Sequence, residues 1–235
     1  MLIRLFILAI TPSIALGLGI YLVDRYDREP ILLLVKIFSL GALTVIPVFI
    51  LQRILLSINI RHDLLKTIFT SFIIAGMTEE YFKREIVLRW AFNNPNFNER
   101  LDGIVYSSFS ALGFATIENI MYIMFRASND NYHIGILRGI LSVPAHILFA
   151  ITMGYYLSLA KYCEDDRLKA GFLYKSLLIP VVFHGIFNFL LMAKIPILML
   201  LFIPYVIYLW KTNLDKLNKY TKHSKNKFNY PSKDE

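Results

Sequence analysis

The sequence predicts an all-α membrane protein, built as a polytopic bundle of about seven transmembrane helices. Hydrophobic residues make up 56% of its 235 residues and charged residues only 18%, whereas soluble domains contain roughly 45 to 50% apolar residues. The mean hydropathy is positive, at +0.53. Apolar segments of about 20 residues, each long enough to cross a bilayer, follow one another along most of the chain with short polar links between them.

A charged turn separates the first two predicted helices. Residues 2–23 form an apolar run that is longer than the core of a signal peptide and precedes further spans, so we interpret it as a transmembrane helix and not as a cleaved leader. The turn at 24–30 reads Asp-Arg-Tyr-Asp-Arg-Glu-Pro. Pro30 suits the first position of a helix, and the second span is therefore predicted over 30–51.

The third predicted span, 67–92, is the one that carries several charged residues in its middle. A polar link at 52–63 precedes it, and an Asn-Asn-Pro-Asn cluster at 93–96 ends it. The remaining spans are predicted over 102–125 with Asp102 as N-cap, 133–162 with a break near Pro144, 170–193, and 195–210.

A basic segment follows the last apolar run and contributes to the formal charge of +8. Lysines beside a membrane span are typical of the cytoplasmic side and of contact with anionic lipid, so we predict a lipid bilayer and no nucleic acid as their partner. We divide the chain into an integral membrane domain, 1–210, and a basic, disordered cytoplasmic tail, 211–235. An odd number of spans then places the amino terminus outside.

Two adjacent carboxylates, Glu79 and Glu80, interrupt the third apolar segment. One ionised side chain in the middle of a membrane costs about 2.5 to 3.5 kcal/mol on insertion scales, so such residues usually serve chemistry or transport. Neighbouring residues on a helix point about 100 degrees apart, which predicts different roles for the two. Lys83 and Arg84, one turn later, can pair with one glutamate and leave the other as a general base. The structural alternative is that these charges only neutralise one another.

Further polar residues lie inside the later apolar segments. They are Glu118 and Asn119 in the fourth span, His146 in the fifth, and His184 with Asn188 one turn later in the sixth. Any one of them could be structural, as a protonated carboxyl group or as a packed histidine. Because lipid offers no water, buried polar groups must find each other, and we expect these residues to converge with the glutamate pair on one site.

Carboxylate, imidazole and carboxamide groups together suit the hydrolysis of an acyl bond, since they can activate water, donate to a leaving amine and stabilise an oxyanion. Serine chemistry is disfavoured because the chain has no G-x-S-x-G motif. Glu118, His146 and His184 are candidate ligands of a divalent metal such as zinc, although no H-E-x-x-H motif is present. Cys163 is the only cysteine, which excludes an intrachain disulfide and a cysteine metal cluster. Metal-activated water and glutamate-activated water without a cofactor both remain open.

These motifs, in this order, resemble the PrsW family of intramembrane proteases, distant relatives of the type II CAAX prenyl endopeptidases and of bacteriocin-processing proteases. The resemblance covers about residues 20–192. The matching pieces are Glu79-Glu80-x-x-Lys83, Phe114-x-x-x-Glu118-Asn119, His146, His184-x-x-x-Asn188 and the turn at 24–30.

The resemblance implies an intramembrane peptidase of the bacterial plasma membrane, with residues 1–210 as its protease domain. Its substrate would be a single-span membrane protein, typically an anti-sigma factor, which it would cut first in a proteolytic cascade during envelope stress. The alternatives are a non-catalytic protein, such as a proton-coupled transporter or a scaffold, and a CAAX endopeptidase that differs only in its substrate. A transporter is disfavoured because the sequence shows no inverted repeat.

The resemblance also implies roles for individual residues. By analogy with the prenyl endopeptidases, the paired glutamates and a histidine would activate water, with Lys83 and Asn119 in supporting positions. His184 and Asn188 would stabilise the oxyanion. Glu118 stands where those relatives have a histidine, so the division of roles among Glu118, His146 and His184 stays open.

Overall fold

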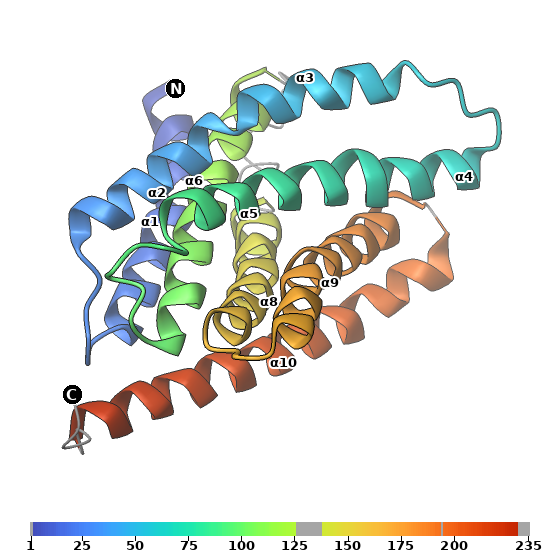
Figure 1. Ribbon diagram of the computed structural model, residues 1–235. Helices are drawn as coiled ribbons and strands as arrows, with labels where there is room; N and C mark the ends of the chain where they lie inside the picture. The colour runs from blue at the N-terminus through green and yellow to red at the C-terminus, as the bar shows by residue number, and fades with distance from the viewer. Residues whose placement is uncertain (1, 126–137, 194, 230–235) are drawn as a thin grey trace.

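A computed structural model describes residues 2–125, 138–193 and 195–229, and the described part of the chain contains helices and no strand (Figure 1). This confirms the predicted all-α class. The helices are α1 (Leu2–Val23), α2 (Ile31–Leu43), α3 (Val45–Leu56), α4 (Asp63–Ile68), the π-helix η1 (Phe69–Met77), α5 (Thr78–Trp90), α6 (Arg100–Phe125), the π-helix η2 (Arg138–Ser142), α8 (Val143–Lys161), α9 (Asp166–Met192) and α10 (Pro196–Asn229).

Five helical segments of the described chain are long and apolar enough to cross a membrane, which confirms a multi-pass membrane protein. They are Ile3–Val23, Ile31–Leu56, Ile140–Lys161, Asp166–Met192 and Pro196–Asn229. The predicted count of seven is not reached by this measure. The two segments that fall short are α5 with its preceding π-helix, which carries the charged residues, and α6, which is rich in serine and lies almost entirely inside the protein.

Most predicted boundaries agree with the structure, and the differences have local causes. The second span continues through α3 to Leu56, because Gln52 finds hydrogen-bond partners on a neighbouring helix and does not begin a polar link. The break predicted near Pro144 is present as a change from π-helix to α-helix at Val143. The predicted start at His133 lies outside the described residues.

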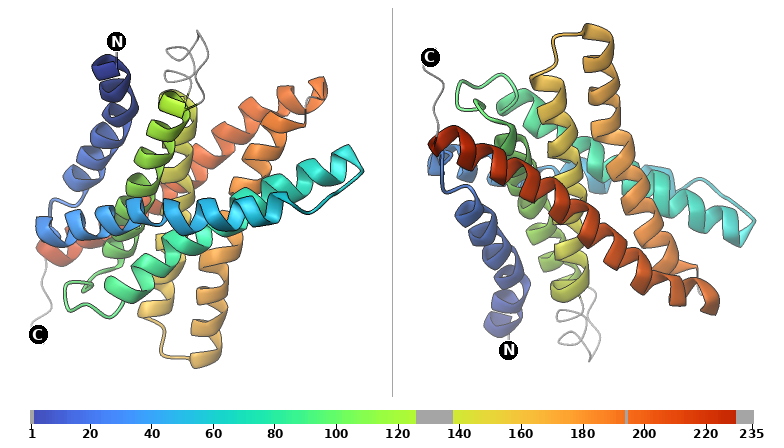
Figure 2. Two further views of the ribbon diagram at one scale, coloured as in Figure 1. Left: turned by 90° about the horizontal axis from the view of Figure 1, so that it is seen from above. Right: turned by 90° about the horizontal axis from the view of Figure 1, so that it is seen from below.

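Helices α6 and α8 form the centre of the bundle. Figures 1 and 2 show α1 and α2 on one side of this pair and α9 on the other, with α10 crossing obliquely beneath α8 and α9. The segment predicted to be a disordered basic tail, 211–235, continues α10 as a helix as far as Asn229. Tyr220 and Ser224 on this part of α10 are buried, so it packs against the protein.

Small residues allow the two central helices to approach closely. A Cβ atom added to Gly154 of α8 would lie 2.1 Å from the backbone oxygen of Gly103 in α6. No real Cβ contact is that short, and a backbone atom cannot rotate away. The contact therefore requires glycine, as close helix packing in membranes often does.

Replacing Gly154 by alanine should force α6 and α8 apart and lower the melting temperature of the purified protein in detergent by roughly 2 to 12 °C, from an overpacking cost of about 1 to 3 kcal/mol. The matched control is Gly171→Ala on α9, where an added Cβ meets no atom within 4 Å. Equal melting temperatures for the two variants would contradict the close contact.

Acidic side chains gather at the end of the bundle where the α1–α2 turn meets the α5–α6 loop. Burial raises the pKa of Asp24 and of Glu29 to about 7, and it also raises the pKa of Glu99. The predicted N-cap, Asp102, lies within the first turn of α6, because this helix begins at Arg100. Its carboxylate accepts from the backbone N–H groups of residues 98 and 99, on the preceding loop.

Candidate active site

The first turn of α5 carries the glutamate pair into the middle of the protein. Glu79, Glu80 and Lys83 are 5%, 1% and 0% exposed. The π-helix before α5 packs against α9 without a side chain between them, since a Cβ on Gly76 would lie 3.0 Å from the backbone oxygen of Val181. This close approach brings the glutamates beside the histidine of α9.

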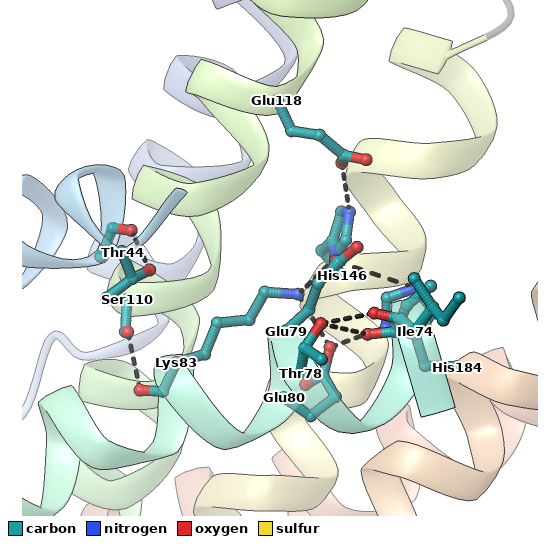
Figure 3. Close-up of polar contacts among 12 residues, drawn as sticks. Thr44, Ile74, Thr78, Glu79, Glu80, Lys83, Ser110, Glu118, His146 and His184 are labelled. Carbon is teal, nitrogen blue, oxygen red and sulfur yellow. Dashed lines mark hydrogen bonds and ion pairs between the residues drawn. The ribbon is translucent and has the colours of Figure 1, made fainter. Parts of the chain in front are cut away.

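Lys83 lies at the centre of the site and contacts three of its residues (Figure 3). Its Nζ donates to Glu80 Oε1 at 2.8 Å and to Glu79 Oε2 at 3.3 Å, and it lies 3.0 Å from His146 Nδ1. The sequence predicted one ion pair and one unpaired glutamate, whereas the lysine contacts both. Arg84 turns away, and donates to the Ser176 hydroxyl at 2.8 Å on α9.

The contacts of His146 determine its tautomer. An ammonium group can only donate, so Nδ1 of His146 accepts from Lys83 with its lone pair. The hydrogen is then on Nε2, which donates to Glu118 Oε2 at 3.1 Å. Glu118 therefore lies behind the imidazole and directs the Nδ1 lone pair towards the two glutamates.

His184 is arranged in the same manner on the opposite side. Its Nδ1 donates to Glu80 Oε1 at 2.9 Å, which leaves the lone pair on Nε2. That Nε2 lies 3.9 Å from Glu79 Oε2. The ring stacks on Phe149 with the centroids 4.9 Å apart, and its centroid is 5.4 Å from that of His146. Stacking and hydrogen bonding together fix the orientation of this imidazole.

Gln52 is a further residue of the site that was not predicted from the sequence. Its Nε2 donates to Glu79 Oε1 at 3.3 Å, to the Thr78 hydroxyl at 3.3 Å and to the backbone oxygen of Ile74 at 3.1 Å. The available signal was an amide beside Arg53 in the otherwise apolar segment 45–56. Gln52 thus fixes Oε1 of Glu79, whereas Oε2 of Glu79 faces Lys83 and His184.

Two of the predicted residues form no hydrogen bond or ion pair with this group. Asn119 is buried and donates to the backbone oxygen of Ala9 at 2.9 Å, which links α6 to α1. Asn188 is half-buried on α9 and makes no hydrogen bond with the described residues. The structure therefore unites Glu79, Glu80, Lys83, His146 and His184 directly, and adds Glu118 through His146.

The donor atoms suit a divalent metal. Glu79, Glu80, His146 and His184 each offer one ligand atom, and these four atoms lie within 4.8 Å of one another. Glu80 Oε2 is buried and has no hydrogen-bond partner. A mixture of imidazole nitrogen and carboxylate oxygen is the donor set of catalytic zinc sites. Glu118, which the sequence suggested as a ligand, is not among the four because it lies behind His146.

The Lys83 ammonium contacts three of these four ligands, so it supplies the positive charge between the carboxylates. Lys83→Met removes this positive charge from two buried carboxylates, and should lower the stability of the metal-free protein by about 3 to 5 kcal/mol. Adding zinc should recover much of this loss, because a bound cation also compensates the carboxylates. Thermal unfolding with and without zinc measures both effects, with the exposed Lys66→Met as control. An unchanged melting temperature in the metal-free variant would reject this role.

Comparisons with known proteins agree with this geometry. A family model described as PrsW family intramembrane metalloprotease matches residues 29–210. Protease PrsW of Clostridioides difficile is 43% identical over 224 residues, which cover 95% of this chain and 94% of that protein. Protease PrsW of Bacillus subtilis is 33% identical over 210 residues, which cover 89% of this chain and 92% of that protein. No solved structure matches the chain.

These matches span the glutamates and histidines and both flanks of the site. They confirm the resemblance in the sequence and the prediction of a peptidase, and they disfavour the transporter and scaffold alternatives. The helices that can span a membrane confirm a multi-pass protein of the bacterial cell membrane. The chain belongs to the PrsW family of intramembrane metalloproteases.

Proposed function

We propose that this peptidase cuts a single-span membrane protein, an anti-sigma factor, as the first step of regulated proteolysis in envelope stress. The observation that carries the catalytic part is the buried group of two carboxylates and two imidazoles from three helices, with donor atoms within 4.8 Å of one another. The choice of an anti-sigma factor follows from the family resemblance. A CAAX endopeptidase remains the second candidate, since it would need the same chemistry on a different substrate.

His146, His184 and Glu79 are the residues that would hold a zinc ion. Each histidine donates one N–H to a carboxylate, Glu118 or Glu80, and directs the lone pair of its other nitrogen towards the cluster. A metal bound to His146 would replace Lys83 as the partner of Nδ1. Glu79 Oε2 is the carboxylate oxygen beside His184 Nε2. Two histidines and one glutamate leave a position open for substrate, as catalytic zinc sites require. A zinc ion bound there would supply Lewis acidity to a peptide carbonyl and to water.

Glu80 is then the general base. Its Oε1 is held by Lys83 and His184, whereas its Oε2 is buried and has no hydrogen-bond partner. This second oxygen can accept a proton from water without breaking an existing hydrogen bond. The different environments of the two glutamates support different roles for them, which is also what their positions on the helix lead us to expect.

Asn188 is the proposed donor to the oxyanion. It follows His184 by one helical turn on α9, and it makes no hydrogen bond with the described residues, so its N–H groups are available to substrate. An amide at this position can stabilise negative charge on a peptide oxygen in the transition state. Asn119 has no such role in this scheme, because its amide donates to α1.

The test is cleavage of single-span anti-sigma factors by the purified full chain in detergent, with a zinc chelator and after zinc is returned. We expect cleavage to stop on chelation and to recover with zinc but not with magnesium. Full cleavage by metal-free protein would reject the metal and favour water activated by glutamate alone. Cleavage of a prenylated CAAX peptide, with no cleavage of anti-sigma factors, would reject the proposed substrate in favour of the second candidate.

A further inference from the structure

A second group of buried acids lies at the end of the bundle and shares no residue with the active site. Asp24 follows α1, Glu99 lies in the α5–α6 loop, and Asp102 lies in the first turn of α6. They are 0%, 4% and 0% exposed. Each offers one carboxylate oxygen, and these three oxygens lie within 4.8 Å of one another. We call Asp24, Glu99 and Asp102 the acidic cluster.

The backbone fixes two of these carboxylates by one oxygen each. Asp24 Oδ2 accepts from the N–H of Glu29 at 2.9 Å, and Asp102 Oδ2 accepts from the N–H groups of Asn98 and Glu99 at 2.8 and 2.7 Å. The other oxygen of each aspartate, and both oxygens of Glu99, are buried and have no hydrogen-bond partner. Four carboxylate oxygens are therefore enclosed by protein and lack a donor.

No described cation forms an ion pair with this group, although Lys227 attracts Glu99 and Lys161 attracts Asp102 over a longer distance. None of the ion pairs among the described residues includes a member of the acidic cluster. The amine of Lys161 donates to the backbone oxygen of Phe92. Glu29 adds a further carboxylate nearby, and its Oε2 accepts from the hydroxyl of Tyr106. A buried carboxylate without a partner costs several kcal/mol, so this group requires a positive ligand or bound protons.

A fourth element supplies an independent sign of a ligand. Ser224 of α10 is 2% exposed, and its hydroxyl lies beside Glu99 without completing a hydrogen bond of normal geometry to it or to another described group. A hydroxyl oxygen can coordinate a cation together with carboxylates. The unpartnered oxygens thus come from the α1–α2 turn, the α5–α6 loop, α6 and α10, and they lie close together.

We propose that the acidic cluster binds a calcium ion that fastens the α1–α2 turn to the α5–α6 loop. All of the available donors are oxygens, which favours calcium, magnesium or manganese over zinc. Oxygens that bind one calcium ion at 2.3 to 2.6 Å lie at most about 5 Å apart, which agrees with the spacing of this group. Glu99 has both oxygens available, as bidentate coordination of calcium requires. Magnesium demands a near-ideal octahedron and keeps several waters, so calcium should bind more tightly.

The ion would stabilise the loop that leads out of α5, the helix of the catalytic glutamates. It would act there as a structural ligand and take no part in the cleavage reaction. The competing arrangement is a pair of carboxyl groups that share a proton, with no metal. The two arrangements differ in whether calcium binds at neutral pH, which is directly measurable.

The experiment is isothermal titration of the full chain in detergent with calcium chloride at pH 7.5, in parallel with magnesium chloride. His184→Ala serves as a background in which the proposed zinc site is disabled. We expect one calcium ion per chain in both backgrounds, weaker binding of magnesium, and a higher melting temperature with calcium. Glu99→Gln should weaken calcium binding by at least about tenfold. Asp27→Asn is the matched control, since it removes an exposed acid from the same end of the bundle.

Absence of saturable binding in the millimolar range would overturn the proposal and favour the shared proton. Equal binding by Glu99→Gln and Asp27→Asn would overturn it as well. If Glu99→Gln does not accumulate, terbium luminescence of the unaltered chain replaces it. Tyr106 lies beside the group and can sensitise bound terbium, and the signal should fall as calcium displaces it. A signal that calcium does not displace would contradict the proposal.

Discussion

Glu80→Gln is expected to lower the turnover number for a single-span substrate by about 10²- to 10⁴-fold, the usual contribution of a general base. Glutamine has nearly the same shape and its oxygen can still accept from His184 and Lys83, so the fold and zinc content should be kept. The lost function is proton acceptance at Oε2, the oxygen that is buried without a partner. Single-turnover cleavage in detergent, together with the zinc content of the same sample, measures the two quantities.

Glu85→Gln is the control for this prediction. Glu85 lies on the same helix as Glu80 and is half-buried. It forms ion pairs with Arg84 and Arg89 and none with the residues of the site. Its turnover should stay within about twofold of the unaltered protein, because surface ion pairs contribute little. Full activity of Glu80→Gln would remove Glu80 as the base. Glu79→Gln would then be the variant to examine, and it is expected to lose zinc as well as activity.

His184→Ala and Asn188→Ala should separate metal binding from oxyanion stabilisation. His184→Ala removes a proposed ligand, so the purified protein should lose its zinc and all measurable cleavage. Asn188→Ala should keep its zinc and its affinity for substrate, but lose about 10²- to 10³-fold in turnover, as the loss of one oxyanion donor does. The measurements are zinc per chain by atomic emission and the separate values of kcat and KM.

The control for the histidine is His62→Ala, an exposed residue before α4 that touches none of the site. It should keep both zinc and turnover. Zinc retained in full by His184→Ala would show that this imidazole is not a ligand. An unchanged turnover number for Asn188→Ala would reject the oxyanion role, whatever its effect on KM.

The apolar segments were predictable because the bilayer imposes their length. The first span, 2–23, agrees with α1 at both ends, and the ranges of α9 and the apolar part of α10 differ from prediction by a few residues. Lipid leaves backbone groups no partner except their own helix, so composition alone determines where helices lie. The π-helix before α5 and the extent of α10 beyond Trp210 were not predictable, since both depend on packing against other helices.

The sequence identified the acids and imidazoles of the site because charge inside lipid is costly wherever it occurs. It could not say which of them meet, since helix rotation and crossing determine that. The contact of Gln52 with Glu79 follows only from the packing of α3 against α5, and the position of Glu118 behind His146 follows only from the packing of α6 against α8. The contact of Lys83 with His146 likewise joins α5 to α8.

What the sequence determined by itself is the membrane, the helices and the chemical kinds of side chain available, since each follows from local composition and the cost of transfer into lipid. What the tertiary structure decided is the grouping of those side chains. It brought one set together as a candidate active site and gathered Asp24, Glu99 and Asp102 into a second set that their separate positions in the chain did not reveal. Contacts between distant segments depend on how whole helices pack, and no short stretch of sequence encodes them.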